Sequence, residues 1–565
     1  MFYQLWNFDM NVFTISWRII CIITAIWTIN AYADSPTLLD NHSPFLPSLK
    51  EKPSQLSQLA EIFVSKIHIT GNTIFSRKDL DFIIKPYENR VVKAEELHEI
   101  KNKLTLFYIS KGYVNSGCVL KDQRIEDCKI EYHIIEGLLD HVTVEGNKRL
   151  KDSFVANRIR LATGDGKRPF NINDLQRRLK ILKQEPSIEN INTYVKPGLK
   201  KGEASLKAVV QEAKPFQVTM DCHNHNSPGI GGYRGDLKFK HLNVLGWADS
   251  LRFEYGGTEG LNKFKAQYEI PINRLDTRLN ASVDHSQTKV VSDSYSPLDI
   301  KGDTTTFSLG INHFLYRTPA TEFTLGLALE TRESNTELRG KPFNFSDGVI
   351  DGTSKVSIFK CTQQWLHRSL NQVVAIHSSI NLGVDILDAN ISDDEAIPDG
   401  KYIAWLGQFQ WIRRLPFFNS QLISRLNMRF TDDPMLAIEK FSIGGASTVR
   451  GYRENLIISD SGFVGSIEWR IPIGKYPFFA LSKTINDGQL HLTPFIDYGK
   501  GKNQNSSTEL DPDTLLGAGL GLKWQISSSA FAEIYWGAAL EDVEIEADSD
   551  VQDDGVHFFI SCQLY

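Results

Sequence analysis

Three side chains of types that bind metals lie close together in the segment "DCHNH". Cys222, His223 and His225 are common ligands of Zn²⁺. The surrounding residues alternate as in a β-strand, so Cys222 is expected to face away from His223, and no fourth ligand is apparent. We therefore predict no metal site here and regard an ordinary strand as the better interpretation.

The usual catalytic and nucleotide-binding motifs are missing from the sequence. It contains neither G-x-S-x-G nor H-E-x-x-H. The segment "ATGDGKRP" (162–169) lacks the spacing of a P-loop and the Ser or Thr that should follow its lysine. Acidic segments such as "DPDT" and "ISDDEAIPDG" are compatible with weak calcium binding, although acidic surface loops are the usual explanation. The prediction is a protein that is not an enzyme and has no cofactor.

One arginine lies in an unusual setting, the segment "FSIGGASTVRGYREN" (441–455). Arg450 is surrounded there by small and turn-forming residues, and Gly444, Gly445 and Gly451 allow tight turns. An arginine enclosed by protein needs a carboxylate, which fits its two-pronged guanidinium. Removing one partner of such a pair costs about 3 to 5 kcal/mol. The alternative is an exposed arginine in a surface loop, and we expect the neighbouring Lys440 and Arg453 to be solvated.

The start of the chain has the features of a secretory signal. Arg18 precedes the apolar run "IICIITAIWTI", and the A-x-A pattern at residues 31–33 suits cleavage, so residues 1–33 are predicted to be a signal peptide. An uncleaved anchor helix is the alternative, and Met10 is an alternative start. With 565 residues and a net charge of -6, the rest should form several units, with no nucleic-acid partner.

Cys118 and Cys128 lie ten residues apart in "CVLKDQRIEDC". In an oxidising compartment this spacing suits a bond between the two arms of a hairpin, which would contribute about 2 to 3 kcal/mol. We predict this disulfide, and we expect Cys222, Cys361 and Cys562 to be inert apolar residues.

A repeat follows the linker at residues 34–62. "KIHITGN" (66–72) is echoed by "HVTVEGN" (141–147), and each is an alternating strand that ends in a Gly-Asn turn pair. Each copy continues with two segments of helical periodicity and then two alternating segments. The prediction is two small α+β domains, at 63–137 and 138–214. Lys and Arg exceed Asp and Glu in the second copy, which suits acidic lipid or a polypeptide, although a solvated face explains it as well.

From residue 215 to 565 the pattern is alternating throughout. "KFKAQYEI" places Phe264 and Tyr268 on one face and Lys265 and Glu269 on the other. Many such strands with polar loops predict an all-β transmembrane barrel with a wet lumen, and a soluble sandwich or propeller is the alternative. At roughly 20 to 22 residues per strand and connection, the segment accommodates about 16 strands.

The combination resembles a known family. Two such repeats ahead of a barrel are similar to POTRA domains, and the whole resembles the transporter subunit of two-partner secretion, the TpsB family of haemolysin and adhesin exporters. Residues 439–455, with Val449, Arg450, Gly451 and Tyr452, are similar to the family's signature in the long sixth extracellular loop. "PFIDYG" (494–499) resembles its F-x-D-x-G strand signature, here Phe495, Asp497 and Gly499.

The resemblance implies a partner for the arginine and a function for the chain. In the family the loop folds into the lumen and its arginine pairs with the strand aspartate, which maps onto Arg450 and Asp497. We also expect Tyr452 to pack beside the arginine. A plug helix precedes the repeats in the family, and here at most a short one is expected. The implied function is ATP-independent export of an unfolded partner exoprotein with an N-terminal secretion domain. The protein would be a monomer in outer-membrane lipid, inserted there by the barrel-assembly machinery. A barrel-assembly factor and a plain pore are the alternatives.

Overall fold

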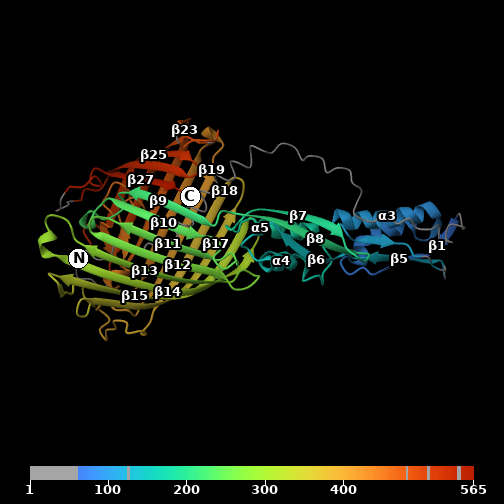
Figure 1. Cartoon of the computed structure of the whole chain (residues 1–565), viewed down its shortest axis with the longest axis horizontal. Coiled ribbons are helices and arrows are strands. Elements are labelled where there is room, and N and C mark those ends of the chain that lie inside the picture. The colour runs from blue at the N-terminus through green and yellow to red at the C-terminus, as the bar shows by residue number, and fades with distance from the viewer. Residues whose placement is uncertain are drawn as a thin grey trace. The chain divides into compact units, whose positions relative to one another are not determined.

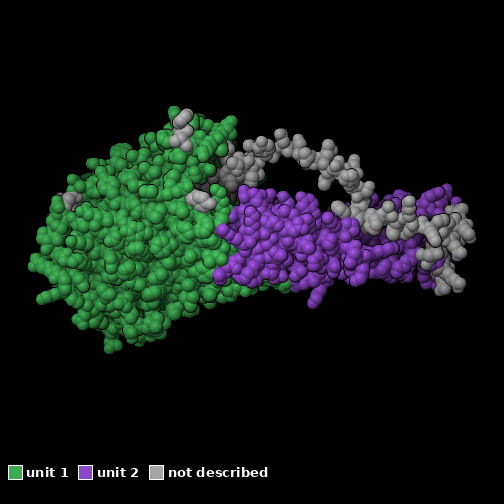
Figure 2. All heavy atoms as spheres, in the orientation of Figure 1, with its two compact units in different colours: residues 1–33, 214–244, 249–565 green, residues 34–213, 245–248 purple. Residues whose placement is uncertain are grey.

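The computed structural model describes residues 61–121, 123, 127–478, 481–485, 487–504, 510–543 and 549–564. The predicted signal peptide and the predicted linker with its short plug helix lie outside these residues, except for Glu61 and Ile62, which belong to a strand. The chain divides into two compact units, one with residues 34–213 and 245–248 and the other with the remainder (Figure 2). Among the described residues, no helix has both the length and the apolar character needed to cross a membrane.

The first repeat has a three-stranded sheet and two main helices. The sheet has the order β2–β5–β4, with β2 parallel to β5 and β4 antiparallel to it. Strands β1 and β3 form a separate pair. In chain order the elements are β1 (Glu61–Val64), β2 (Lys66–Thr70), α2 (Arg77–Ile84), β3 (Arg90–Lys93), α3 (Ala94–Ser110), β4 (Gly117–Val119) and β5 (Lys129–Ile135).

The second repeat has the same design, with sheet order β6–β8–β7. Its elements are β6 (Leu138–Glu145), α4 (Asp152–Arg160), α5 (Ile172–Leu182), β7 (Ile188–Pro197) and β8 (Glu203–Glu212). Each repeat buries its own apolar cluster between the helices and one sheet face, as the helical and alternating periodicities require. The predicted order of strand, two helices and two strands is confirmed, with β1 and β3 as additions in the first copy.

In each repeat, one glutamate near the end of the last strand fixes the Gly-Asn turn. Glu136 directly follows β5, and Glu212 is the last residue of β8. The Glu136 carboxylate accepts hydrogen bonds from the backbone N–H groups of Thr73 (2.7 Å) and Ile74 (3.0 Å). The Glu212 carboxylate accepts three, from the N–H groups of residues 148–150 at 2.7 to 2.8 Å. The Gly-Asn pair itself recurs because Gly71 and Gly146 both have positive φ (74° and 83°), and the side chains of Asn72 and Asn147 both donate to a backbone carbonyl three residues later, at 2.6 Å.

The remaining unit is a closed antiparallel barrel of 16 strands, which confirms the predicted fold class and strand number (Figure 1). The first strand, β9, pairs with the last, β27, and closes it. The strands are β9 (Phe216–His223), β10 (Arg234–His241), β11 (Ser250–Gly257), β12 (Leu261–Pro271), β13 (Arg278–Lys289), β14 (Ile300–Arg317), β15 (Thr321–Leu338), β17 (Thr353–Arg368), β18 (Gln372–Gly383), β19 (Ile403–Arg414), β20 (Gln421–Thr431), β23 (Ser461–Lys475), β24 (Gln489–Lys502), β25 (Thr514–Ser527), β26 (Ala530–Ala539) and β27 (Val556–Gln563), with the two-residue β16 (Lys341–Pro342) appended to β15.

The alternation along the strands separates two environments. On β14, Phe307 and Leu309 are more than half exposed on the outer face, whereas Thr306 is buried on the inner face. On β12 the inward Lys263 is buried and pairs with Asp284 of β13 at 3.1 Å. An apolar outside and a polar, charge-paired inside are what a lipid-embedded barrel requires.

The two ends of the barrel differ in the length of their connections. The connection between β20 and β23, residues 432–460, is the longest, whereas the connections at the other end include 318–320 and 369–371. In barrels of this class short turns face the periplasm and long loops face the outside. We therefore call residues 432–460 loop 6, the sixth extracellular connection, and residues 540–555 loop 8.

The predicted disulfide between Cys118 and Cys128 is wrong, because both cysteines are free. Cys118 lies in β4 opposite Ile134 of β5, whereas Cys128 directly precedes β5. Six residues along a strand correspond to roughly 20 Å, far beyond the reach of a disulfide. The spacing in the sequence suggested a short hairpin, but Cys118 pairs with the far end of β5 and Cys128 precedes its start.

Candidate functional site

Loop 6 folds into a small hairpin. Its arms, β21 (Phe441–Ile443) and β22 (Ile457–Ser459), pair antiparallel. Gly444, Gly445 and Gly451 all have φ near +100°, a conformation that side chains rarely adopt. The predicted tight turns are therefore present at the tip between these arms.

Arg450, at the tip, makes the contact expected for it. Its Nε donates to Oδ2 of Asp497 at 2.7 Å and its Nη2 donates to Oδ1 at 2.8 Å, a bidentate pair. The backbone N–H of Arg450 also donates to Asp497 Oδ2, at 3.1 Å. Both side chains are at most 4% exposed, so the charges lie away from water and depend on each other.

Further residues from neighbouring strands complete the surroundings of the guanidinium. Arg450 Nη1 donates to Glu468 of β23 at 3.1 Å, and Nη2 donates to the hydroxyl of Ser466 at 3.3 Å. The guanidinium lies 3.6 Å from the ring centroid of Phe495 and 4.7 Å from that of Tyr535, so both rings add cation–π attraction. The sequence interpretation missed Glu468, although the alternating "SIEWR" places Ser466, Glu468 and Arg470 on one face of the strand.

The strand signature forms the floor of the site. Phe495, Asp497 and Gly499 of β24 alternate inward and are buried. A Cβ atom at Gly499 would lie 2.5 Å from Ile443 and 2.9 Å from Val449, and one at Gly517 of β25 would lie 2.0 Å from the carbonyl oxygen of Arg450. Glycine is needed at these two positions because the loop backbone and side chains rest directly on the strands.

Tyr452 plays another part than the one expected. The rings over Arg450 are those of Phe495 and Tyr535, whereas the Tyr452 hydroxyl donates to the carbonyl of Leu516 at 2.9 Å and accepts from the N–H of Glu541 at 3.0 Å. Tyr452 and Val449 are buried in an apolar cluster with strand residues. Tyr452 therefore ties the loop to β25 and to loop 8.

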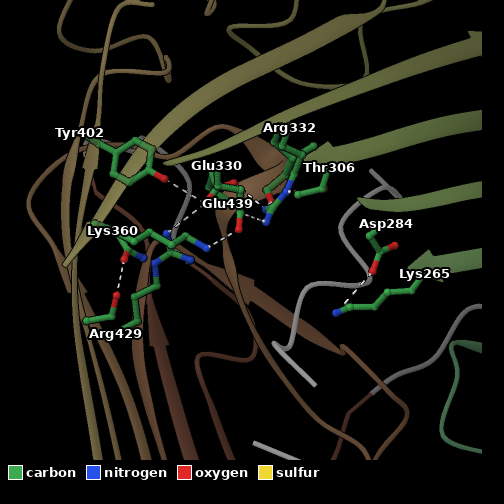
Figure 3. A network of polar contacts seen from close by, with 12 residues as sticks. Lys265, Asp284, Thr306, Glu330, Arg332, Lys360, Tyr402, Arg429 and Glu439 are labelled. Atoms are coloured by element: carbon green, nitrogen blue, oxygen red, sulfur yellow. Dashed lines mark hydrogen bonds and ion pairs between the residues drawn. The ribbon is translucent and has the colours of Figure 1, made fainter. Parts of the chain in front are cut away.

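A second charged contact anchors the beginning of loop 6 (Figure 3). Glu439 accepts a hydrogen bond from Arg332 Nη1 of β15 at 2.6 Å and one from the Tyr402 hydroxyl at 3.0 Å. Arg332 also donates to Glu330 (2.8 Å) and to the carbonyl of Ile438 (3.0 Å), and Lys360 donates to Glu330 at 2.9 Å. The loop is thus held by its glutamate to β15 and by its arginine to β24.

Lys440 and Arg453 are not solvated as expected. Lys440 Nζ lies 3.1 Å from Asp460, and its side chain is 20% exposed. Arg453 makes a two-pronged contact with Asp553 of loop 8, with Nη2 to Oδ2 at 2.6 Å, and its side chain is 11% exposed. The partner of Lys440 lies at the other end of loop 6, and that of Arg453 lies in loop 8, about 100 residues later, so neither pairing could be predicted from the local sequence.

Cys222 and His223 lie on opposite faces of β9, as the alternating pattern predicted. Cys222 is exposed on the outer face of β9, whereas His223 is buried and lies 3.0 Å from Asp236. Across the described part of the chain, no group of three or more His, Cys, Asp or Glu side chains is arranged to bind a metal ion.

The fold and the site together define the class of protein. A closed lumenal barrel with an ion-paired extracellular loop, preceded by small α/β domains, is an outer-membrane transport barrel with its POTRA domains in the periplasm. The profile of the family "Haemolysin secretion/activation protein ShlB/FhaC/HecB" matches residues 202–524, and that of the POTRA domain of ShlB type matches residues 62–137. The chain belongs to this family, the transporters of two-partner secretion.

Individual relatives are distant in sequence. The heme/hemopexin transporter protein HuxB of Haemophilus influenzae is 22% identical over 456 residues, which cover 77% of this chain and 74% of HuxB. The outer membrane transporter CdiB of Dickeya dadantii is 20% identical, covering 75% of this chain and 76% of CdiB. The solved structure of CdiB from Escherichia coli superposes with a TM-score of 0.65 at 18% identity, covering 93% of both chains, which supports the same fold.

Proposed function

We propose that this protein exports one secreted partner protein across the outer membrane without ATP. The POTRA domains bind an unfolded segment of the partner in the periplasm, and the barrel passes the chain outward. By analogy with the family, folding of the partner outside supplies the energy. The sequence contains no nucleotide-binding motif. Family membership supports the transport of protein, and the capture of an unfolded partner is our inference.

The observation that carries the proposal is loop 6 inside the barrel, joined to its wall by Arg450 and Asp497. A plain pore needs no loop held by buried charges, because such a pair costs desolvation energy on both sides. A transporter of unfolded chains does need a removable obstruction, since barrels of 16 strands otherwise leave an aqueous channel that would leak solutes. An ion pair at the loop tip is suited to that purpose, because a buried ion pair is strong and can form again after it has been broken.

One sheet edge in the second POTRA domain is suited to capture. β7 pairs with β8 on one side only, and no described strand pairs with its other edge, along which Tyr194 is 56% exposed. An extended peptide can add to such an edge through backbone hydrogen bonds. The edge of β2 in the first domain is less open, because Glu88 accepts from the N–H of Ile67 and Arg77 donates to its carbonyl.

The test measures export of a candidate partner exoprotein in cells that carry wild type, Arg450→Ala or Asp497→Ala. Heat-modifiable migration checks that each barrel inserts. Arg339→Ala, which removes an exposed arginine between β15 and β17, is the matched control. We expect insertion of all variants and loss of export in the first two alone. Unchanged export in Arg450→Ala would contradict the proposal. Depletion of other outer-membrane barrels on loss of this protein would instead favour an assembly factor.

A further inference from the structure

Gln552 of loop 8 is completely buried, and its side-chain amide joins three separate segments. Its Oε1 accepts from the backbone N–H of Glu454, in the tip of loop 6, at 2.9 Å. Its Nε2 donates to the carbonyls of Asn224 at 2.9 Å and Asn226 at 2.7 Å, which directly follow β9. Both polar atoms of this amide are therefore used by backbone groups more than 90 residues away in sequence.

Asn224 in turn completes the seam between the first and last strands. The backbone ladder of β9 and β27 has its last pair at His223 and Phe559 on the extracellular side. Beyond it, the Asn224 side chain accepts from the N–H of Phe558 at 2.8 Å and donates to the carbonyl of Val556 at 2.8 Å. The backbone N–H of Asn224 still donates to the carbonyl of Phe558, but only at 3.4 Å, and the side-chain amide supplies the acceptor for the return bond. The position of Asn224 therefore decides how firmly this end of the seam is closed.

The tip of loop 6 also lies next to Gln552. Arg453 contacts Asp553, the residue after Gln552. Arg450, three residues before Arg453, pairs with Asp497 of β24. Displacement of the tip from β24 would withdraw the N–H of Glu454 from Gln552. A buried amide oxygen left without a donor carries a desolvation penalty, so Gln552 would have to reorient and release Asn224 and Asn226.

We propose that Gln552 is a positioning residue that couples the seating of loop 6 to closure of the extracellular end of the β9–β27 seam. A seated loop 6 favours a closed seam, and a closed seam favours a seated loop 6, because both depend on the Gln552 side chain. The coupling is therefore reciprocal. This inference goes beyond partner export and needs no partner protein for its test.

The test is hydrogen exchange, followed by mass spectrometry, on the full chain in lipid nanodiscs. The reporters are the seam amides of Asn224 and Phe558 and the loop amide of Glu454. With Gln552 present, Arg450→Ala should speed exchange at the loop and also at the seam. We expect about tenfold at each, the effect of losing one hydrogen bond of about 1.4 kcal/mol. In a Gln552→Ala background, Arg450→Ala should speed only the loop.

Two further variants keep the result interpretable. Gln552→Glu retains an acceptor for the Glu454 N–H but loses the donors to Asn224 and Asn226, so the seam should exchange faster while Glu454 stays protected. Gln525→Ala, which removes an amide that donates to Ser527 in β25, should change neither reporter. The proposal is overturned if Arg450→Ala leaves the seam unchanged when Gln552 is present, or speeds it equally in both backgrounds.

Discussion

Glu439 and Arg332 form a buried ion pair, with 2.6 Å between Oε1 and Nη1, and its polarity is the reverse of that of Arg450 and Asp497. The loop supplies the anion in one pair and the cation in the other, and the barrel wall supplies the opposite charge. The two anchors have opposite signs and therefore restrict the register of the loop on the barrel wall. A shift that brought Arg450 to Arg332, or Glu439 to Asp497, would place like charges together.

Glu439→Ala should loosen the beginning of loop 6 while Arg450 keeps its own contacts. Arg332 would retain Glu330, so we expect a cost of about 1 to 3 kcal/mol and an intact barrel. The measurement is single-channel conductance in planar bilayers, where the variant should open more often than wild type. Glu439→Gln should have a smaller effect, and Glu337→Ala, an exposed glutamate of β15, should have none. Equal behaviour of Glu439→Ala and Glu337→Ala would contradict a role as anchor.

Arg450 and Asp497 should show strong energetic coupling. Every hydrogen bond that the described residues donate to the Asp497 carboxylate comes from Arg450, so Arg450→Ala leaves a buried carboxylate without a partner. Each single variant should lower the free energy of unfolding by about 3 to 5 kcal/mol, and the double variant should cost less than the sum. Urea unfolding in lipid vesicles measures the free energy of unfolding of the wild type, the two single variants and the double variant. Additive effects would show that the two charges do not depend on each other.

Gly517→Ala should displace loop 6 without changing any charge. The new methyl group would lie 2.0 Å from the carbonyl oxygen of Arg450, and overpacking of this kind costs about 1 to 3 kcal/mol. We expect faster proteolysis within residues 444–456. Gly465→Ala on β23 is the matched control, because the nearest atom to its Cβ is 4.0 Å away. Similar proteolysis of the two variants would argue against direct contact between the loop and β25.

The two cysteines of the first POTRA domain should differ in reactivity. Burial raises the pKa of the Cys118 thiol to about 12, so about one thiol in ten thousand is ionised at pH 8. Cys128 is exposed. Maleimide at pH 8 should therefore modify Cys128 and leave Cys118 free until the chain is unfolded, as peptide mass spectrometry can resolve. Protection of both thiols until a reductant is added would instead indicate the disulfide.

The sequence predicted features that depend on local periodicity. Alternation over residues 215–565 indicates strands with one apolar face, and the repeat of the Gly-Asn turn indicates two domains of one design. The pairing of Arg450 with Asp497 came from the resemblance of two motifs, since nothing in their spacing connects them. These inferences concern side-chain periodicity and short motifs, which a single chain displays directly.

Tertiary structure decided which distant residues meet. Gln552 and Asn224 are 328 residues apart, and they come together only because the last strand closes the barrel against the first. Arg332 and Glu439 meet because loop 6 folds back into the lumen, and Cys118 and Cys128 stay apart because strand register, and not distance along the chain, sets their separation. Sequence by itself determined the elements and their faces. Closure and register determined the contacts, because they are properties of the whole sheet and of no single segment.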